Sequence, residues 1–437
     1  MKSQAMKNTV LRGKPDAGNP HARFDEGASA SEEPRRKALL HKDKVYRAIA
    51  FCSLLAACGL VRAGDVLPLV DLSGETNRDV IVAARTEKQY QGHPTTGMTS
   101  AWRPSVRWRG FNLLGMFCRT KMKNGDKRIF GYFPEDRFQW MEDWGFNFAR
   151  LPLDYRFFVE KGDWMKPVES QLAKLDEAVR LGKKHGIHVQ INFHRAPGYC
   201  CNPPREPKSL FRDAEPLAAF TNLWGVLARR YRGIPNEELS FDLVNEPAPV
   251  AFYGATPSNY AVVARAAFAA IRAVDPGRFV MSDGWSWGVV PVKELHPFDH
   301  ASGESIHCYE PHGFTHYRVA NENDPKPCPP WPPKGCADGA EWLERYYGKV
   351  WRSAIDDGTF LFVGEFGCCQ RTGIPHASYL VWLEDVLKMC ERHGWGWALW
   401  NLDGQFGILD TSRTDCEFED FHGHKLDRKA LELLKRY

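Results

Sequence analysis

The stretch "SFDLVNEPAP" at residues 240–249 decides the fold, because it carries an apolar run directly into an acid. Asn245, Glu246 and Pro247 follow the run without the glycine that a tight turn would need. A second stretch, "FLFVGEFG" at residues 360–367, has the same form and delivers Glu365. Both stretches predict a buried strand that ends in a carboxylate.

Runs of this kind recur along the chain from residue 106 and alternate with longer amphipathic segments. Such alternation predicts parallel strands joined by crossover helices. Eight strand-like runs are found, at residues 106–117, 146–155, 187–195, 239–247, 278–285, 304–311, 360–367 and 396–404. We therefore predict an α/β fold, a (β/α)8 TIM barrel over residues 106–437. A nucleotide-binding fold is disfavoured because no Gly-rich phosphate loop follows the first run.

Two of the intervening segments show why helices are expected. In the segment 171–186, Leu172, Leu175 and Val179 fall at helical spacing and Gly186 closes the pattern. The segment 258–277 behaves likewise, with Ser258 as the expected N-cap and a Pro-Gly pair as the stop.

The start of the chain has the features of a leader. Basic residues precede a short apolar run at about 45–63 that ends in small residues, which is typical of an export signal in the leader 1–64. "LAAC" resembles a bacterial lipoprotein processing site that would lipidate Cys58, and cleavage after Ala63 is the alternative. We expect a bacterial protein that is exported, whether secreted, periplasmic or surface-anchored. Residues 65–105 form a short N-terminal appendage of unassigned role.

Composition narrows the class of partner. Within residues 1–47, Lys and Arg outnumber Asp and Glu by 11 to 6, a net charge of +5, so the remainder of the chain has a net charge of −1 and is close to neutral. A neutral body without an arginine-rich stripe argues against nucleic acid as a partner. The 15 tryptophans exceed ordinary core needs and favour a cleft that holds flat sugar rings. Nothing in the sequence calls for more than a monomer.

Cysteine and histidine spacing does not predict a metal or another cofactor. The vicinal pairs Cys200-Cys201 and Cys368-Cys369 lack zinc-site spacing with partner histidines. His312 and His316 are four residues apart, but Pro311 and Gly313 interrupt any helix between them. Of the twelve cysteines, Cys328 and Cys336 bracket a proline-rich loop that a disulfide could close.

In barrels of this type the loops after the strands build the active site, so polar residues that close the strands are informative. Six strands supply such residues: Arg150, His194, Asn245, Glu246, His307, Tyr309, Glu365 and Trp400. Two carboxylates facing one another suit glycoside cleavage, in which one donates a proton to the leaving oxygen and the other attacks the anomeric carbon. Mutual repulsion at about 5 Å raises the pKa of one of them and so divides the two tasks.

The motifs "DLVNEP", "VGEFG", "FHR", "HCY" and "ALWNLDGQFGILD" resemble glycoside hydrolase family 5, over residues 106 to 437. The resemblance implies a retaining enzyme with Glu246 as acid/base and Glu365 as nucleophile. It further implies binding or orienting roles for the other six residues, namely Arg150 at the nucleophile, Asn245 and His194 at the sugar beside the reacting carbon, His307 and Tyr309 at the two carboxylates, and Trp400 as a sugar platform.

The expected activity is that of an endo-β-1,4-glucanase acting on a polysaccharide or oligosaccharide. Within the same family, a β-mannanase, a xyloglucanase or another β-glucanase are the alternatives, and a non-catalytic glycan-binding surface lipoprotein is a more distant one. The chain departs from the family pattern at "HRAPGYCCNPP" and at Asp403, both where substrate subsites form. Tyr199, Trp285, Trp287 and Trp331 are candidate stacking residues, and packing in the interior is the equal alternative for each of them.

Overall fold

The structure, a computed structural model, describes residues 102–117, 131–296, 299 and 301–437. The predicted leader, with its signal at 45–63 and Cys58, lies outside the described residues, as does the appendage up to residue 101. Among the helices described, none combines the length and apolar character needed to cross a bilayer.

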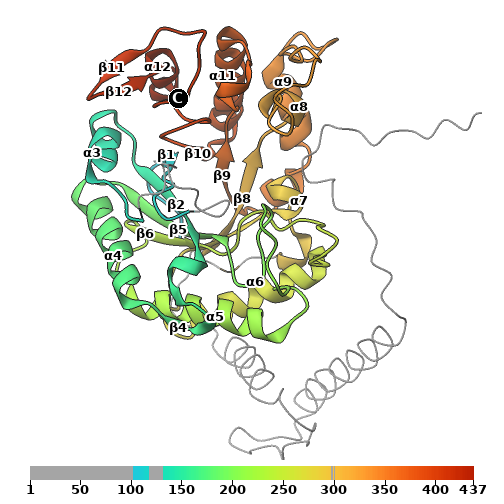
Figure 1. Ribbon diagram of the computed structural model, residues 1–437. Coiled ribbons are helices and arrows are strands. Elements are labelled where there is room, and N and C mark those ends of the chain that lie inside the picture. Colours follow the sequence, from blue (N-terminus) through green and yellow to red (C-terminus); the bar gives the residue numbers. More distant parts are fainter. Residues whose placement is uncertain (1–101, 118–130, 297–298, 300) are drawn as a thin grey trace, which may run out of the picture.

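Eight parallel strands close into a barrel, which confirms the predicted fold (Figure 1). Each strand pairs with its neighbour in chain order, and β1 closes against β10. Every strand lies within, or within two residues of, one of the eight predicted runs. The strands are β1 Arg109–Asn112, β2 Phe148–Asp154, β5 His188–Arg195, β6 Leu239–Asp242, β7 Val280–Asp283, β8 Ser302–Cys308, β9 Phe360–Phe366 and β10 Gly396–Leu399.

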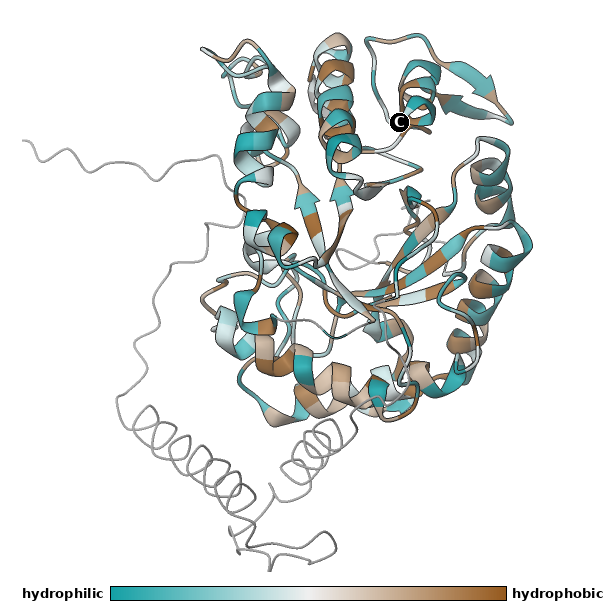
Figure 2. Ribbon diagram, turned by 180° about the vertical axis from the view of Figure 1, so that it is seen from behind, coloured by the Kyte–Doolittle hydropathy of each residue, from teal (hydrophilic) through white to brown (hydrophobic). Residues whose placement is uncertain are grey.

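Helices surround the barrel and carry hydrophobic and hydrophilic residues side by side (Figure 2), as expected for elements that face a sheet on one side and water on the other. The longer ones are α3 Glu135–Asp143, α4 Glu169–Lys184, α5 Ala214–Arg230, α6 Pro257–Arg272, α11 His376–His393 and α12 Arg428–Arg436. Shorter helical segments are η1 Tyr155–Phe157, α7 Trp285–Gly288, η2 Lys293–Leu295, α8 His312–Thr315, α9 Gly339–Leu343, η3 Glu344–Gly348, α10 Arg352–Asp356 and η4 Gln370–Thr372. Two small antiparallel pairs join β3 Val159–Glu160 to β4 Asp163–Pro167 and β11 Glu419–Phe421 to β12 His424–Leu426.

The helix ends follow local chemistry, with one departure from the predicted cap. Helix α4 ends before Gly186, whose φ of 64° is the left-handed conformation that glycine adopts without strain. The N-cap of α6 is Thr256, and the prediction of Ser258 was wrong. Thr256 and Asn259 exchange side-chain and backbone hydrogen bonds in a capping box, and Pro257 occupies the first helical position.

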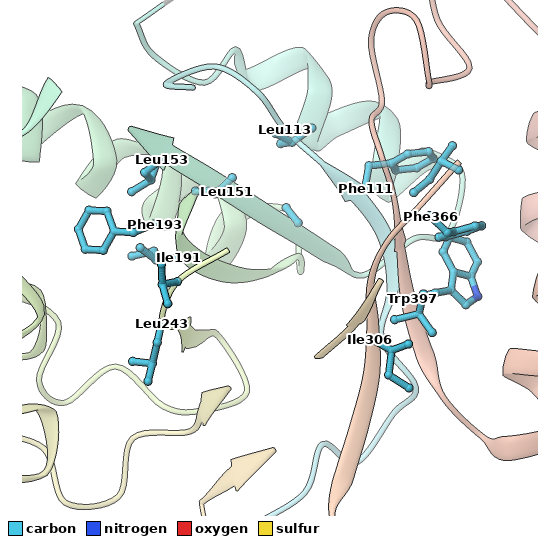
Figure 3. Close-up of a cluster of buried hydrophobic side chains, with 14 of the residues drawn as sticks. Phe111, Leu113, Leu151, Leu153, Ile191, Phe193, Leu243, Ile306, Phe366 and Trp397 are labelled. Atoms are coloured by element: carbon cyan, nitrogen blue, oxygen red, sulfur yellow. The ribbon is translucent and has the colours of Figure 1, made fainter. Parts of the chain in front are cut away.

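The core lies mainly between the strands and the helices (Figure 3). Leu151, Ile191 and Phe193 are at most 1% exposed there, and burying one such side chain stabilises the fold by about 1.5–3 kcal/mol. A second cluster, which includes Trp108, Phe148 and Phe279, forms a separate buried layer. Trp102 packs its ring against Trp108 and Phe279, so the last residues of the predicted appendage contact the barrel.

The chain around Glu246 does not continue as a regular strand. Pairing of β6 with its neighbours ends at Asp242, four residues earlier than the acid, whereas the sequence predicted a strand over 239–247. Backbone bonds from Leu243 N to Met281 O (3.0 Å) and from Asn245 N to Phe193 O (3.1 Å) still anchor the segment on both sides. Glu246 itself has a φ of 49°, in the left-handed region that a non-glycine residue adopts at a cost of about 1–3 kcal/mol. The segment is therefore fixed in a strained turn that sets where the carboxylate lies.

Candidate active site

A cavity of about 370 Å³ opens where the loops follow the barrel strands. Its walls come from the ends of several strands, as the fold class leads one to expect. Six of the eight predicted site residues line it: His194, Glu246, His307, Tyr309, Glu365 and Trp400. The other two, Arg150 and Asn245, are fully buried and hydrogen-bonded to one another (Nη2 to Oδ1, 3.0 Å). The structure therefore brings all eight into one neighbourhood.

Glu246 and Glu365 face each other across a short gap. One carboxylate oxygen of each, together with a ring nitrogen of His307, lie within 4.8 Å of one another. Glu365 comes from β9 and is 2% exposed, whereas Glu246 comes from the turn after β6 and is 9% exposed. Such a gap is close enough for each carboxylate to influence the charge of the other.

Arg150 binds Glu365 directly. Its Nη1 donates to Glu365 Oε1 at 2.7 Å and its Nε to Asp242 Oδ2 at 2.9 Å. Burial alone would lower the pKa of this guanidinium, but the charges of Asp242, Glu365 and Asp283 raise it above its ordinary value. Burial, followed by repulsion from Asp283, raises the pKa of Asp242 to about 7. Arg150 thus remains a cation at the centre of three buried acids.

His307 bridges the acids on the other side of the site. Its Nδ1 lies 3.0 Å from Glu246 Oε1 and 3.6 Å from Glu365 Oε2, and its Nε2 lies 3.2 Å from Asp283 Oδ2. Burial opposes a charge on this ring, yet the carboxylates of Asp283 and Glu365 raise the pKa of His307 well above its ordinary value. With both nitrogens protonated, the ring hydrogen-bonds to Glu246 through Nδ1 and forms an ion pair with Asp283 through Nε2.

The remaining predicted residues complete the surroundings of Glu365. The Tyr309 hydroxyl donates to Glu365 Oε2 at 2.9 Å, and His194 Nε2 lies 3.8 Å from Oε1. Burial raises the pKa of Tyr309 well above its ordinary value, so its hydroxyl stays a donor. The His194 ring is tilted against Trp400, with centroids 5.2 Å apart, and Trp400 presents an aromatic face to the cavity.

Several residues that shape the site were not predicted from the sequence. Asp283 Oδ2 accepts the backbone N–H of Glu246 at 2.8 Å, Asn112 Oδ1 accepts from Arg150 Nη1 at 3.1 Å, and Cys201 Sγ donates to Glu246 Oε2 at 3.1 Å. Asp242, Asp283 and Asn112 each end a strand within an otherwise apolar run. A polar residue at that point was the signal that could have found them, and it was available in the printed sequence.

The structure shows which of the four candidate stacking residues line the cavity and which are buried. Trp287 lines the cavity. For Tyr199 and Trp331 the packing alternative holds: Tyr199 is fully buried and donates its hydroxyl to the backbone oxygen of Glu246 at 2.6 Å, and Trp331 is buried with its ring nitrogen on Asp385. Trp285 packs against the core. Asp403 pairs with Arg137 at 2.9 Å and is absent from the cavity lining.

The described cysteines and two clusters of acidic and histidine side chains bear on disulfide formation and metal binding. All nine cysteines in the described part of the chain are free thiols, so the disulfide that could close the loop between Cys328 and Cys336 is not formed. Two groups there have side chains close enough to share a cation, namely Glu246 with His307 and Glu365, and His376 with Cys416 and Asp427. In the first group a protonated His307 cannot be a ligand. In the second, His376 Nε2 and Asp427 Oδ2 already form a hydrogen bond of 2.7 Å.

Comparison with known proteins identifies a family. The model described as cellulase, glycosyl hydrolase family 5, matches residues 118–405. Cellodextrinase A of Ruminococcus flavefaciens is 25% identical over 292 residues, which is 65% of this chain and 82% of that protein. Endoglucanase C of Acetivibrio thermocellus is 25% identical over 283 residues, which is 59% of this chain and 80% of that protein.

Solved structures agree with the fold. A crystal structure described as a glycoside hydrolase is 32% identical, covers 76% of this chain and 99% of its own, and superposes with a TM-score of 0.68. Endoglucanase Cel5A of Thermotoga maritima is 22% identical, covers 75% and 96%, and has a TM-score of 0.59. The second likeness supports the barrel alone.

Proposed function

The chain belongs to glycosyl hydrolase family 5, the cellulase family, and on that premise we propose that it cleaves internal β-1,4 bonds of a glucan with retention of configuration. The observation that carries the proposal is the gap between Glu246 and Glu365, whose nearest oxygens lie within 4.8 Å. Retaining enzymes place their carboxyl groups about 5–5.5 Å apart, whereas inverting enzymes need about 6.5–9.5 Å to admit a water molecule. The observed gap supports direct attack on the sugar.

The hydrogen bonds support a division of roles between the two acids. Glu365 receives donors on both oxygens, from Arg150 at 2.7 Å and Tyr309 at 2.9 Å, which favours the ionised form that a nucleophile requires. Glu246 lines the same cavity and is the more exposed of the two, at 9% against 2%. We assign Glu365 as the nucleophile and Glu246 as the acid/base.

The reaction then proceeds in two displacements. In the first, Glu365 attacks the anomeric carbon while Glu246 gives its proton to the departing glycosidic oxygen, and an ester to Glu365 forms as the C–O bond breaks. The charge on Glu365 is then gone, so Glu246 loses the repulsion that favoured its protonated form. In the second displacement, Glu246 takes a proton from water, which attacks the anomeric carbon, breaks its bond to the ester oxygen and releases Glu365 as a carboxylate. The two inversions together restore the original configuration.

The remaining residues position the sugar. Trp400 offers a flat apolar face and His194 lies beside it, an arrangement that suits the face of a pyranose ring. Asn245 is fully buried and held by Arg150 at 3.0 Å, and its contact with the hydroxyl next to the reacting carbon stays a prediction. The names of the relatives, a cellodextrinase and an endoglucanase, favour a β-glucan as the substrate over mannan or xyloglucan.

We further propose export, on the basis of the basic and apolar pattern at residues 45–63, with either lipidation at Cys58 or cleavage after Ala63. Mass spectrometry of the mature protein from its own host would separate the two, since a diacylglyceryl group adds a fixed mass at Cys58. An N-terminus that retains residues 1–44 would overturn export through this signal.

A panel of polysaccharides with reducing-end detection tests the proposed activity. We expect release of reducing ends from carboxymethyl cellulose or mixed-linkage glucan, and loss of that activity by at least about 10³-fold in Glu365→Ala. Equal activity of Glu365→Ala and the wild type would remove the catalytic assignment. A wild type that binds glycan in affinity electrophoresis but cleaves nothing in the panel would favour the binding-protein alternative.

A further inference from the structure

The thiol of Cys201 contacts the proposed acid/base directly. Cys201 lies in the loop after β5, lines the cavity and is 8% exposed. Its Sγ donates to Glu246 Oε2 at 3.1 Å, while the other oxygen of that carboxylate faces His307 Nδ1 at 3.0 Å. Each oxygen of Glu246 therefore has its own side-chain partner.

Two amide groups approach the sulfur of Cys201 and so restrict the direction of its S–H bond. Asn202 Nδ2 donates to Cys201 Sγ at 3.3 Å, and Asn245 Nδ2 approaches the same sulfur at 3.7 Å. A thiol carries one hydrogen and a sulfur that is a weak acceptor. Because both amides donate to the sulfur, the single hydrogen of Cys201 is available to an acceptor, and Glu246 Oε2 and the sulfur of Cys200 are the two acceptors beside it.

The thiol stays protonated over the range in which such an enzyme works. Its hydrogen bond with Cys200, burial and the charge of Glu246 together raise the pKa of Cys201 well above its ordinary value. A protonated thiol is a donor, but a weaker one than a hydroxyl or an amide. It can therefore steer a carboxylate without holding it firmly in the ionised form.

We propose that Cys201 is a positioning residue for Glu246, one that holds Oε2 in place through a weak S–H hydrogen bond while letting the carboxyl group keep its proton. The inference rests on the proposed function, in which Glu246 must be protonated in the first displacement and ionised in the second. A strong donor at this position would favour the ionised form and weaken the acid. A thiol suits both states because it also accepts weakly when Oε2 carries the proton.

The test compares Cys201→Ala and Cys201→Ser through the pH dependence of kcat/KM on a β-glucan oligosaccharide. The alkaline limb of that profile reports the pKa of the group that must be protonated. Removing the donor in Cys201→Ala destabilises the carboxylate, so we expect the limb to move up by about 0.5 unit. A hydroxyl in Cys201→Ser is a stronger donor, so the limb moves down by about the same amount.

The matched control is Cys390→Ala, which removes a buried sulfur in α11 that does not line the cavity, and its limb should coincide with that of the wild type. Alkaline limbs that stay within about 0.2 unit of the wild type in both Cys201 variants, or that move in the same direction, would overturn the inference. If Cys201→Ala fails to fold, as shown by its thermal unfolding, the downward shift in Cys201→Ser decides alone. A wild-type enzyme that cleaves none of the glycans tested would instead contradict the proposed function.

Discussion

Replacing Asp283 by Asn tests the electrostatics beneath the two glutamates. Asp283 is fully buried, and its Oδ2 lies 3.2 Å from His307 Nε2 and 2.8 Å from the backbone nitrogen of Glu246. Although burial opposes it, His307 and Arg150 lower the pKa of Asp283 to about 2, so the residue is an anion. Asparagine keeps the shape and can still accept from Glu246 N–H, but it removes the charge.

The expected magnitude follows from the distance. Two unit charges 3.2 Å apart interact by about 5 kcal/mol at an effective dielectric constant of about 20. One pKa unit corresponds to about 1.4 kcal/mol, and the new amide recovers part of the loss. We therefore expect the pKa of His307 to fall by at least about 2 units in Asp283→Asn.

The effect on stability has a definite sign. The raised pKa of His307 contributes stability that is complete below the unfolded-state value of about 6.5 and is lost as pH rises through the folded-state value. The lowered pKa of Asp283 contributes stability present above about 3.8 and lost as pH falls through about 2. The wild type should exceed Asp283→Asn most between these limits, by about 3–5 kcal/mol.

Urea unfolding at pH 5.5 and at pH 9.5 measures this difference, and NMR titration of the histidine ring protons reports the pKa of His307. The stability difference should be smaller at the higher pH, because the contribution of His307 diminishes as pH rises towards its raised folded-state pKa. A difference independent of pH, with His307 titrating near 6.5 in both proteins, would refute the ion pair. Asp403→Asn, at an acid paired with Arg137 away from the cavity, is a charge-matched control whose His307 titration should equal that of the wild type.

Three further predictions concern single side chains. Tyr309→Phe removes the 2.9 Å donor to Glu365 and should lower kcat by about 10- to 100-fold, and an unchanged kcat would contradict its role. Trp400→Ala should raise KM on oligosaccharides by about 10-fold as the aromatic face is lost, and isothermal calorimetry with an inactive Glu365→Ala background would show whether binding is affected. Leu151→Ala opens a cavity in the fully buried core and should lower the free energy of unfolding, measured in urea, by about 2–5 kcal/mol. The kcat of the folded fraction should not change. A loss below about 1 kcal/mol would mean that the core repacks around the alanine.

The sequence was sufficient for the barrel and for the residues at the ends of its strands. Strand runs are short and apolar because parallel strands are buried on both faces, and this signal survives without an alignment. A strand that ends in Glu365 is visible in the same way. The resemblance to the family implied a role for each of the eight residues. The structure brings these residues into one neighbourhood, and experiments are needed to assign their roles.

The features that were not predicted from the sequence depend on contacts between residues that are distant in the chain. Asp283 and Cys201 are far from Glu246 in the chain, and only closure of the barrel brings them within 3.1 Å of it. The end of β6 at Asp242 was missed because the residues that follow it are still apolar. They keep backbone hydrogen bonds to the neighbouring strands but no longer pair with them in regular register. The role of Tyr199 stayed open because an aromatic residue near a strand end has the same signal whether it stacks on sugar or packs inward.

The central claim is that Glu365 attacks the sugar, and trapping the covalent intermediate tests it most directly. An activated 2-deoxy-2-fluoro-β-cellobioside slows both displacements while its good leaving group preserves the first, so the ester accumulates. Peptide mass spectrometry should then find one fluorinated disaccharide on the peptide that contains Glu365, and the adduct should disappear in Glu365→Ala. An adduct on another residue, or an enzyme that releases product of inverted configuration, would contradict the account.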